Sequence, residues 1–193
     1  MSFVSLALKE WAVITRALAR GEQFLVLRKG GIREQQKRFV LEGNRFLLYP
    51  TYEHQSPDLL KPRWHEALAH TIAQAPPPDT VVIDTLAEVV EILEVTEPER
   101  VTALEDFYIC TNDYAQYRLK WRPKHPLSII LLRAMKLKRA YSVPVLARYG
   151  GCVSWVELED PINVTGAQAV IPDEVLRTGI NRIKEAVGTA VPV

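Results

Sequence analysis

Gly21 to Arg33 reads GEQFLVLRKGGIR and joins a short aliphatic strand to a cationic turn that contains two glycines. The segment Phe24–Leu27 is hydrophobic throughout, which is typical of a buried strand. Arg28 and Lys29 follow directly, at the predicted end of that strand. Guanidinium and ammonium groups in such a place suit an anionic ligand such as a phosphate. A basic pair at a strand end can also meet only solvent, so both interpretations stay open.

The 193 residues are 48% hydrophobic, which predicts one globular domain with an ample core. A net charge of +1 excludes a strong overall field toward nucleic acid or membranes. Two cysteines without a Cys-x-x-Cys pair exclude a disulfide framework, and no apolar run approaches the ~18 residues of a membrane span. We therefore expect a soluble protein of a reducing cytoplasm, with no membrane contact and no cofactor.

The charged residues are segregated along the chain. Residues 114–155 contain nine basic residues and no Asp or Glu, whereas residues 79–106 contain nine acidic residues and one Arg. Either the surface carries separate positive and negative regions, or the two segments lie side by side and neutralise each other.

The hydrophobic pattern predicts an α+β fold of short strands with intervening helices. Helices are predicted at residues 4–20, 61–74, 112–119 and 173–187, with a shorter helix inside 96–107 that starts from a capping box. Strands are predicted at residues 23–28, 38–42, 46–49, 80–84, 88–95, 127–137 and 153–158. We expect a single domain over residues 1–159, followed at 160–193 by a linker and a C-terminal amphipathic helix.

A polar and aromatic loop, TYEHQ, follows the strand predicted at residues 46–49. Tyr52 can stack on a base, while the Glu53 carboxylate or the Gln55 amide can read the edge of that base. Glu53 and His54 can instead form a general acid–base pair. A loop with a purely structural role is the third interpretation.

A second aromatic and basic segment, YAQYRLKWRPKH, spans Tyr114 to His125. Its aromatic faces can stack on bases while Arg118 and Arg122 contact phosphates, with Trp121 beside them. The competing interpretation is a short helix that packs its aromatic residues inward and leaves its charges in solvent.

The histidines of HEALAH, His65 and His70, do not form a zinc-protease motif. That chemistry needs histidines at i and i+4, whereas these two are five residues apart and about 140° apart around a helix. We predict two surface histidines and no metal site. Cys110 and Cys152 have no neighbours that mark a nucleophile, so both are predicted to be buried structural thiols.

Five segments of the chain carry a family resemblance: LKEWAV (Leu8–Val13), LRKGGI (Leu27–Ile32), FLLYPTYEHQ (Phe46–Gln55), WRPKHPL (Trp121–Leu127) and GGCVSWVEL (Gly150–Leu158). Together they resemble a bacterial family catalogued as a domain of unknown function, number 1802. The resemblance covers residues 6 to about 159 and implies no assigned activity. Some members of that family are described alongside a restriction-endonuclease-type domain, which implies a nucleic-acid setting by association only.

Four further positions resemble the Gly-x-Lys-x-x-Glu-x-Arg motif of ASCH domains, which belong to the PUA-like superfamily. Gly21 and Arg28 match, Gln23 replaces the Lys and Val26 replaces the Glu. The resemblance implies a small mixed β-barrel with peripheral helices, and a cleft beside the motif strand that is linked to RNA or modified-base binding. Loss of the Lys and the Glu weakens the case for catalysis.

We therefore predict a protein that binds RNA, DNA or a nucleotide through a basic and aromatic cleft. A competing hypothesis is a nucleic-acid-processing hydrolase or nuclease, with Glu53 and His54 as acid–base candidates and Asp113 as a possible third group. A third is an accessory protein-interaction module of a restriction-type system that pairs through helix 173–187, although docking on its own core explains that helix equally well. The expected ligand-binding residues are Arg28, Lys29, Arg33, Tyr52, His54, Gln55, Arg118, Trp121 and Arg122, with Glu53 shaping the pocket.

Overall fold

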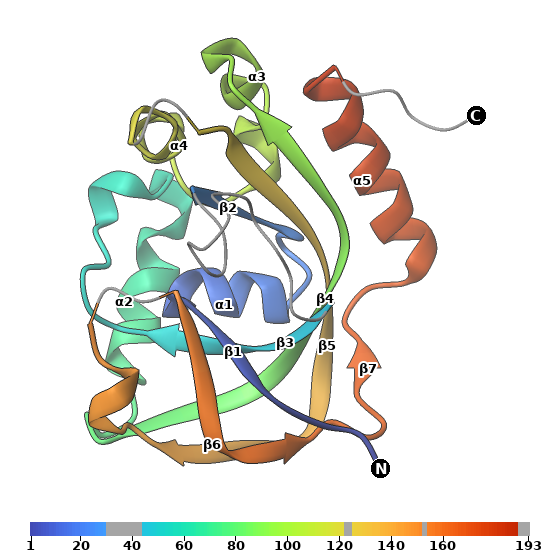
Figure 1. Cartoon of the computed structure of the whole chain (residues 1–193). Coiled ribbons are helices and arrows are strands. Elements are labelled where there is room, and N and C mark those ends of the chain that lie inside the picture. Colours follow the sequence, from blue (N-terminus) through green and yellow to red (C-terminus); the bar gives the residue numbers. More distant parts are fainter. Residues whose placement is uncertain (30–43, 122–124, 152–153, 189–193) are drawn as a thin grey trace.

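The computed structural model describes residues 1–29, 44–121, 125–151 and 154–188, which form a mixed α+β fold (Figure 1). Seven strands in these residues make one sheet, in the order β2-β5-β4-β3-β1-β6, with β7 paired to β5. The strands are β1 (Phe3–Trp11), β2 (Leu25–Lys29), β3 (Arg45–Thr51), β4 (Thr80–Val95), β5 (Leu127–Pro144), β6 (Trp155–Asn163) and β7 (Gln168–Ala169). The helices are α1 (Ala12–Ala19), α2 (His65–Ala73), α3 (Pro98–Thr102), α4 (Asn112–Lys120) and α5 (Asp173–Ala186).

The predicted α+β class is confirmed, but the sheet is open rather than closed into a barrel. β2 pairs only with β5 and β6 pairs only with β1, so no hydrogen-bonded ladder joins these two end strands within the described residues. The sheet bends strongly instead, because β4 and β5 are long and curve through the molecule (Figure 1).

β4 and β5 form a long antiparallel pair, from Val95 opposite Leu127 to Thr80 opposite Pro144. Residues 80–84 and 88–95, predicted as two strands, form one strand with a register shift after Ile83 and another after Val89. These irregularities let a long strand bend without ending. The predicted strand 127–137 likewise continues to Pro144.

This pairing also places the acidic segment beside the basic one. Glu88 lies opposite Arg133 in the register, and Lys136 Nζ is 2.5 Å from Asp84 Oδ2. The two segments therefore lie side by side, as one of the two interpretations requires. Asp84 and Lys136 form an ion pair between them, whereas Glu88 pairs with Arg45 and Arg133 with Asp173.

The helix predicted at residues 4–20 is wrong over its first half. Phe3–Trp11 is a strand that pairs in parallel with β3 and antiparallel with β6, and only Ala12–Ala19 is helical. Pairing on both sides outweighs the local preference for helix. The predicted C-terminal cap is confirmed, since Gly21 adopts φ +69°, a conformation that glycine permits beyond a helix end.

The other predicted helices are confirmed in position: α4 is one residue longer than predicted, and α2 and α5 are shorter. α2, α4 and α5 fall within or near the predicted ranges, whereas the 96–107 helix is reduced to α3 and a separate 3₁₀ turn at Glu105–Phe107. No side chain caps α3, so the expected capping box is absent there. The expected linker at 160–171 instead holds the end of β6 and all of β7, and the strand predicted at 38–42 lies outside the described residues.

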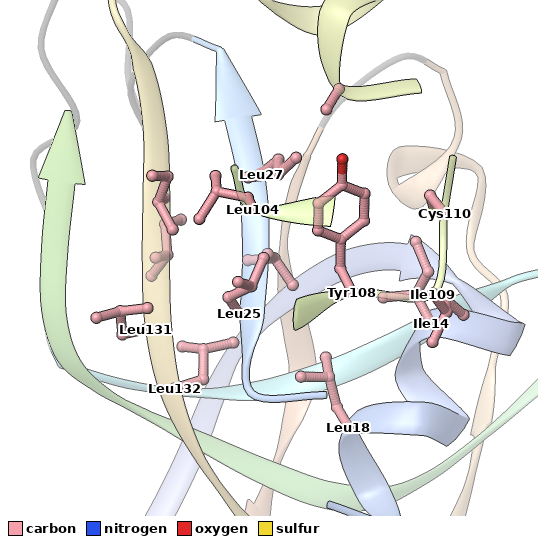
Figure 2. Packing of buried hydrophobic residues seen from close by; sticks show 14 of the residues in the cluster. Ile14, Leu18, Leu25, Leu27, Leu104, Tyr108, Ile109, Cys110, Leu131 and Leu132 are labelled. Atoms are coloured by element: carbon pink, nitrogen blue, oxygen red, sulfur yellow. The ribbon is translucent and has the colours of Figure 1, made fainter. Parts of the chain in front are cut away.

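The core lies on both faces of the sheet. Leu8 and Leu48 point into the larger hydrophobic cluster, whereas their strand neighbours Ala7 and Leu47 belong to a smaller one on the opposite face. Figure 2 shows part of the larger cluster, where Leu18 of α1 and Leu25 of β2 lie near Leu132 of β5. One side of α5 also belongs to this cluster, through Leu176, Ile180, Ile183 and, just beyond the helix, Val187.

None of the described helices combines the length and the apolar composition needed to cross a bilayer.

Candidate ligand-binding cleft

A cleft of about 740 Å³, here called the main cleft, brings together five of the predicted site residues. Arg28 comes from β2, Arg118 from α4, and Tyr52, Glu53 and His54 from the loop after β3. Residues 75–78 and 149–151 also line the main cleft. Segments far apart in the sequence therefore converge on one hollow surface.

Arg28 is held in the wall of the main cleft by Glu10, a residue of β1. Arg28 Nη2 is 2.9 Å from Glu10 Oε2 and donates a hydrogen bond of 2.6 Å to the carbonyl of Lys9. The side chains of Arg28 and Glu10 are only 12% and 3% exposed. Within the described residues the buried Arg28 Nε has no hydrogen-bond partner. Arg28 is thus a neutralised, fixed group with an unused donor, rather than a free phosphate clamp.

Glu10 also accepts a hydrogen bond of 2.9 Å from the backbone N–H of Trp11 through Oε1. The sequence analysis did not single out Glu10, because it placed this residue within a helix. In a strand, a carboxylate at the end of an otherwise buried segment is a signal of a paired or functional charge.

Arg118 is the second cation of the main cleft and is anchored from two sides. Its guanidinium lies 4.5 Å from the centre of the Tyr114 ring, and Nη1 donates to the carbonyl of Leu27 at 3.3 Å. Although burial opposes the charge, Tyr114 and Glu10 raise the pKa of Arg118, which stays a permanent cation. Burial, reinforced by Glu10, raises the pKa of Tyr114, so the phenol beneath it stays neutral.

The Tyr52–His54 loop forms the rim of the main cleft. Tyr52 is partly buried, and burial together with the charge of Asp84 raises its pKa. Glu53 and His54 are exposed, and His54 has φ +60°, the sole positive φ outside glycine in the part of the chain that the structure describes. This left-handed backbone turns the loop back over the cleft.

Gln55, predicted to bind ligand, instead supports the loop and a helix. Its Oε1 accepts a hydrogen bond of 3.0 Å from the backbone N–H of Val13, in the first turn of α1. Its Nε2 donates to the carbonyl of Tyr52 at 3.3 Å. Gln55 does not line the main cleft, and these contacts give it a structural role.

Other predicted residues lie away from the main cleft. Lys29 is buried on the opposite side of β2, where Nζ donates 2.6 Å to the carbonyl of Leu119 and burial lowers its pKa. Trp121, half exposed just beyond α4, and the exposed Asp113 are not among the cleft residues. Arg33 and Arg122 lie outside the described residues.

An aromatic and basic wall completes the main cleft. Lys9 Nζ donates to the carbonyls of Tyr149 at 2.8 Å and Gly151 at 3.2 Å, which ties β1 to that turn. The rings of Tyr49 and Tyr149 meet edge to face, with centroids 6.4 Å apart. Lys9, Tyr49 and Tyr149 could not be identified as site residues from the sequence, because no local pattern links Lys9 and Tyr49 to Tyr149, which lies about 100 residues further along the chain.

The two replaced positions of the ASCH-like motif have structural roles. Gln23 is buried, donates 2.7 Å to the carbonyl of Leu25 and accepts 2.9 Å from the N–H of Ile109. Val26 is buried on the same face of β2 as Arg28. Neither position carries a group that can exchange a proton with a ligand.

The histidines and the described cysteine have separate surroundings. His65 Nε2 is 3.1 Å from the carbonyl of Leu60, whereas His70 Nδ1 is 2.9 Å from Arg16 Nη1. Across residues 1–29, 44–121, 125–151 and 154–188, no group of three His, Cys, Asp or Glu side chains is arranged to hold a metal. Cys110 is a buried free thiol whose pKa is raised by burial, and Cys152 falls outside these ranges.

Comparison with known proteins adds a structural and a family match. Among solved structures, the chain is similar to a mutant of ZmASCH from Zymomonas mobilis, with 11% identity, 80% of this chain and 87% of that chain covered, and a TM-score of 0.42. No curated protein matches the chain significantly. A family model described as a domain of unknown function (DUF1802) matches residues 7–181, and the chain therefore belongs to the DUF1802 family.

Proposed function

We propose that the main cleft binds a nucleotide, either free or as an unpaired nucleotide of RNA or DNA. The observation that carries the proposal is that Arg28, Tyr52, His54 and Arg118 line one cleft although they come from separate segments. Its volume of about 740 Å³ falls in the range of small-molecule sites, roughly 300–1,000 Å³. The rim tyrosine offers a stacking face and the inner wall offers hydrogen-bond donors.

The charges of the main cleft favour recognition of a base over recognition of a long phosphate backbone. Lys9, Arg28 and Arg118 are balanced in part by Glu10 and Glu53, which also line the cleft. A nearly neutral, aromatic site gains affinity from stacking and from hydrogen bonds to base edges. We therefore expect the affinity for oligonucleotides to fall only gently with salt, in contrast to proteins that track many phosphates.

Binding can be tested by calorimetric titration of the full chain with nucleosides, nucleotides and short single-stranded RNA and DNA at several salt concentrations. Tyr52→Leu should weaken binding by about tenfold, because stacking contributes roughly 1–3 kcal/mol per base. Tyr117→Leu is the matched control, since this ring is 73% exposed on α4 and does not line the main cleft. Absence of binding at low salt, or equal effects of the two variants, would contradict the proposal.

A second candidate function is hydrolysis of a bound nucleotide or nucleic acid. It is favoured by the adjacent Glu53 and His54 on the cleft rim and by the left-handed backbone at His54, a conformation that residues other than glycine adopt mainly where the surroundings require it. Replacing both residues with Gln should abolish any turnover while leaving the fold intact, because both side chains are exposed. Turnover that survives the double replacement would remove these residues from consideration.

A further inference from the structure

A second cavity of about 380 Å³, here called the side cavity, adjoins the main cleft. It lies between α1, the end of α2 and the paired strands β4 and β5. Pro50, Tyr52 and Pro76 line both cavities, so these three residues form the partition between them. A ligand that passes Tyr52 can therefore occupy both.

The side cavity differs from the main cleft in its charge. Three cations line it, Arg16, Arg20 and Lys136, against the single carboxylate of Asp84. That carboxylate is already engaged, because Lys136 Nζ is 2.5 Å from Oδ2 and Thr85 Oγ1 donates 2.6 Å to Oδ1. An ammonium group has three donor protons, so Lys136 keeps donors for an anion.

The cationic side chains of the side cavity differ in how firmly other residues hold them. Arg16 links α1 to α2, since Nη1 is 2.9 Å from His70 Nδ1 and donates 3.1 Å to Thr71 Oγ1. Arg20 is 56% exposed, and the one carboxylate that it reaches among the described residues is that of Glu22, at 3.9 Å. Arg20 and Lys136 can therefore turn toward an incoming anion without loss of an internal contact that holds helices together.

The side chains of α1 that line the side cavity are small. Ala12, Thr15 and Ala19 recur on one face of the helix and leave room for a tetrahedral group between the helix and β4. Hydroxyl groups from α1, α2 and β4 surround this space, through Thr15, Thr71 and Thr85. Each of these hydroxyls already donates its proton within the protein, to Ala12 O, Ala67 O and Asp84 Oδ1, so the cations are the donors available to phosphate oxygens.

We propose that the side cavity binds the phosphate of a nucleotide whose base lies in the main cleft, so that the ligand class is a nucleoside phosphate rather than a nucleoside. The inference rests on the proposed function of the main cleft. The two compartments match the two parts of such a ligand, a flat uncharged base and a compact dianion. Tyr52, which lines both compartments, lies where the two parts of the ligand would join.

The test compares nucleosides with their phosphates on the full chain. Each of the four ribonucleosides and its 5′-monophosphate is titrated calorimetrically into the wild type, into an Arg20→Gln/Lys136→Gln variant and into a Lys138→Gln/Arg139→Gln control. The control removes two cations from β5 that do not line either cavity. Arg16 is left in place because it holds α1 against α2.

We expect the monophosphate to bind the wild type and the control about tenfold more tightly than the nucleoside. In the Arg20→Gln/Lys136→Gln variant this preference should fall to about twofold, with nucleoside affinity unchanged. Nucleoside binding without a preference for the monophosphate, or a preference that the variant retains, overturns the phosphate site while leaving the main cleft standing. Failure of every nucleoside and monophosphate to bind overturns both proposals.

Discussion

At the scale of single residues, the buried pair of Glu10 and Arg28 determines what the main cleft offers a ligand. Arg28 and Lys29 are adjacent in sequence, so the basic pair suggested one phosphate-binding group. Side chains alternate along a strand, however, and β2 sends Arg28 toward the main cleft and Lys29 to the opposite face. The period of a strand could have separated these two residues in advance. The partner of Arg28 could not have been found, because β1 and β2 are separated by three strands in the sheet and only the folded arrangement brings Glu10 to Arg28.

The first prediction concerns this pair. Glu10→Gln should lower the free energy of unfolding by about 3 kcal/mol, since it leaves the Arg28 guanidinium buried without its carboxylate. Arg28→Met should cost a similar amount, and the double variant should cost less than the sum, because the two losses are one interaction. Urea denaturation of the four proteins measures the cycle.

The control for the first prediction is Glu88→Gln. Glu88 pairs with Arg45 at 3.7 Å, and about a third of each side chain is exposed. An exposed pair is screened by water and should contribute under about 1 kcal/mol. Equal costs for the Glu10 and Glu88 replacements would contradict a special role for the buried pair.

The second prediction concerns Tyr108, whose hydroxyl is buried without a hydrogen-bond partner among the described residues. Its ring belongs to the larger hydrophobic cluster, part of which Figure 2 shows. Tyr108→Phe removes an unsatisfied polar group and should raise the free energy of unfolding at pH 8 by about 1 kcal/mol. Tyr117→Phe, at an exposed position, should change it by less than about 0.5 kcal/mol.

The same variant should alter the response to alkali. Burial raises the pKa of Tyr108 in the folded protein, whereas an unfolded tyrosine ionises near pH 10. Above about pH 10 the unfolded chain releases this proton first, so the free energy of unfolding falls as the pH rises. Tyr108→Phe should make that fall shallower in denaturation curves measured between pH 8 and 11. An unchanged slope would show that Tyr108 is accessible to water.

At the scale of elements, the sequence predicts buried strands and late helices well and the first element poorly. β2, β3 and β5 have continuous apolar cores, and α5 has an apolar side with a helical period, so local pattern and environment agree. Phe3–Trp11 contains helix-forming residues, and only its pairing with β3 and β6 makes it a strand. Because these partner strands lie some 40 and 150 residues further along the chain, the local pattern of residues 3–11 does not indicate the pairing.

The third prediction concerns the start of α1. Trp11 precedes the helix and supplies no side-chain cap. The side-chain oxygen Oε1 of Gln55 accepts the hydrogen bond from the backbone N–H of Val13 instead. Gln55→Leu should therefore destabilise the protein by about 1 kcal/mol, the usual value of a lost helix cap. Gln116→Leu, which alters an exposed contact of α4, is the comparison and should cost less. Greater protection from hydrogen exchange at Val13 in the Gln55 variant would oppose this assignment.

At the scale of the whole molecule, α5 belongs to the same hydrophobic cluster as β2 and β5. We predict that Ile183→Ala, at a fully buried position, lowers the free energy of unfolding by about 3 kcal/mol in one cooperative transition. Val175→Ala, on the exposed side of α5, should change it by less than about 0.5 kcal/mol. A separate early transition in the Ile183 variant would instead mark α5 as an independent unit available to a partner.

The place of β1 in the sheet has a consequence for how the protein is made. β1 lies between β3 and β6, and Leu8 of β1 meets Trp155 of β6 roughly 150 residues later. At synthesis rates of about 5–20 residues per second, β6 is synthesised on the order of ten seconds after β1. During that interval the edge of β1 that later pairs with β6 has no strand to pair with. We therefore expect slow folding dominated by distant contacts, with this strand edge exposed to chaperones while synthesis continues.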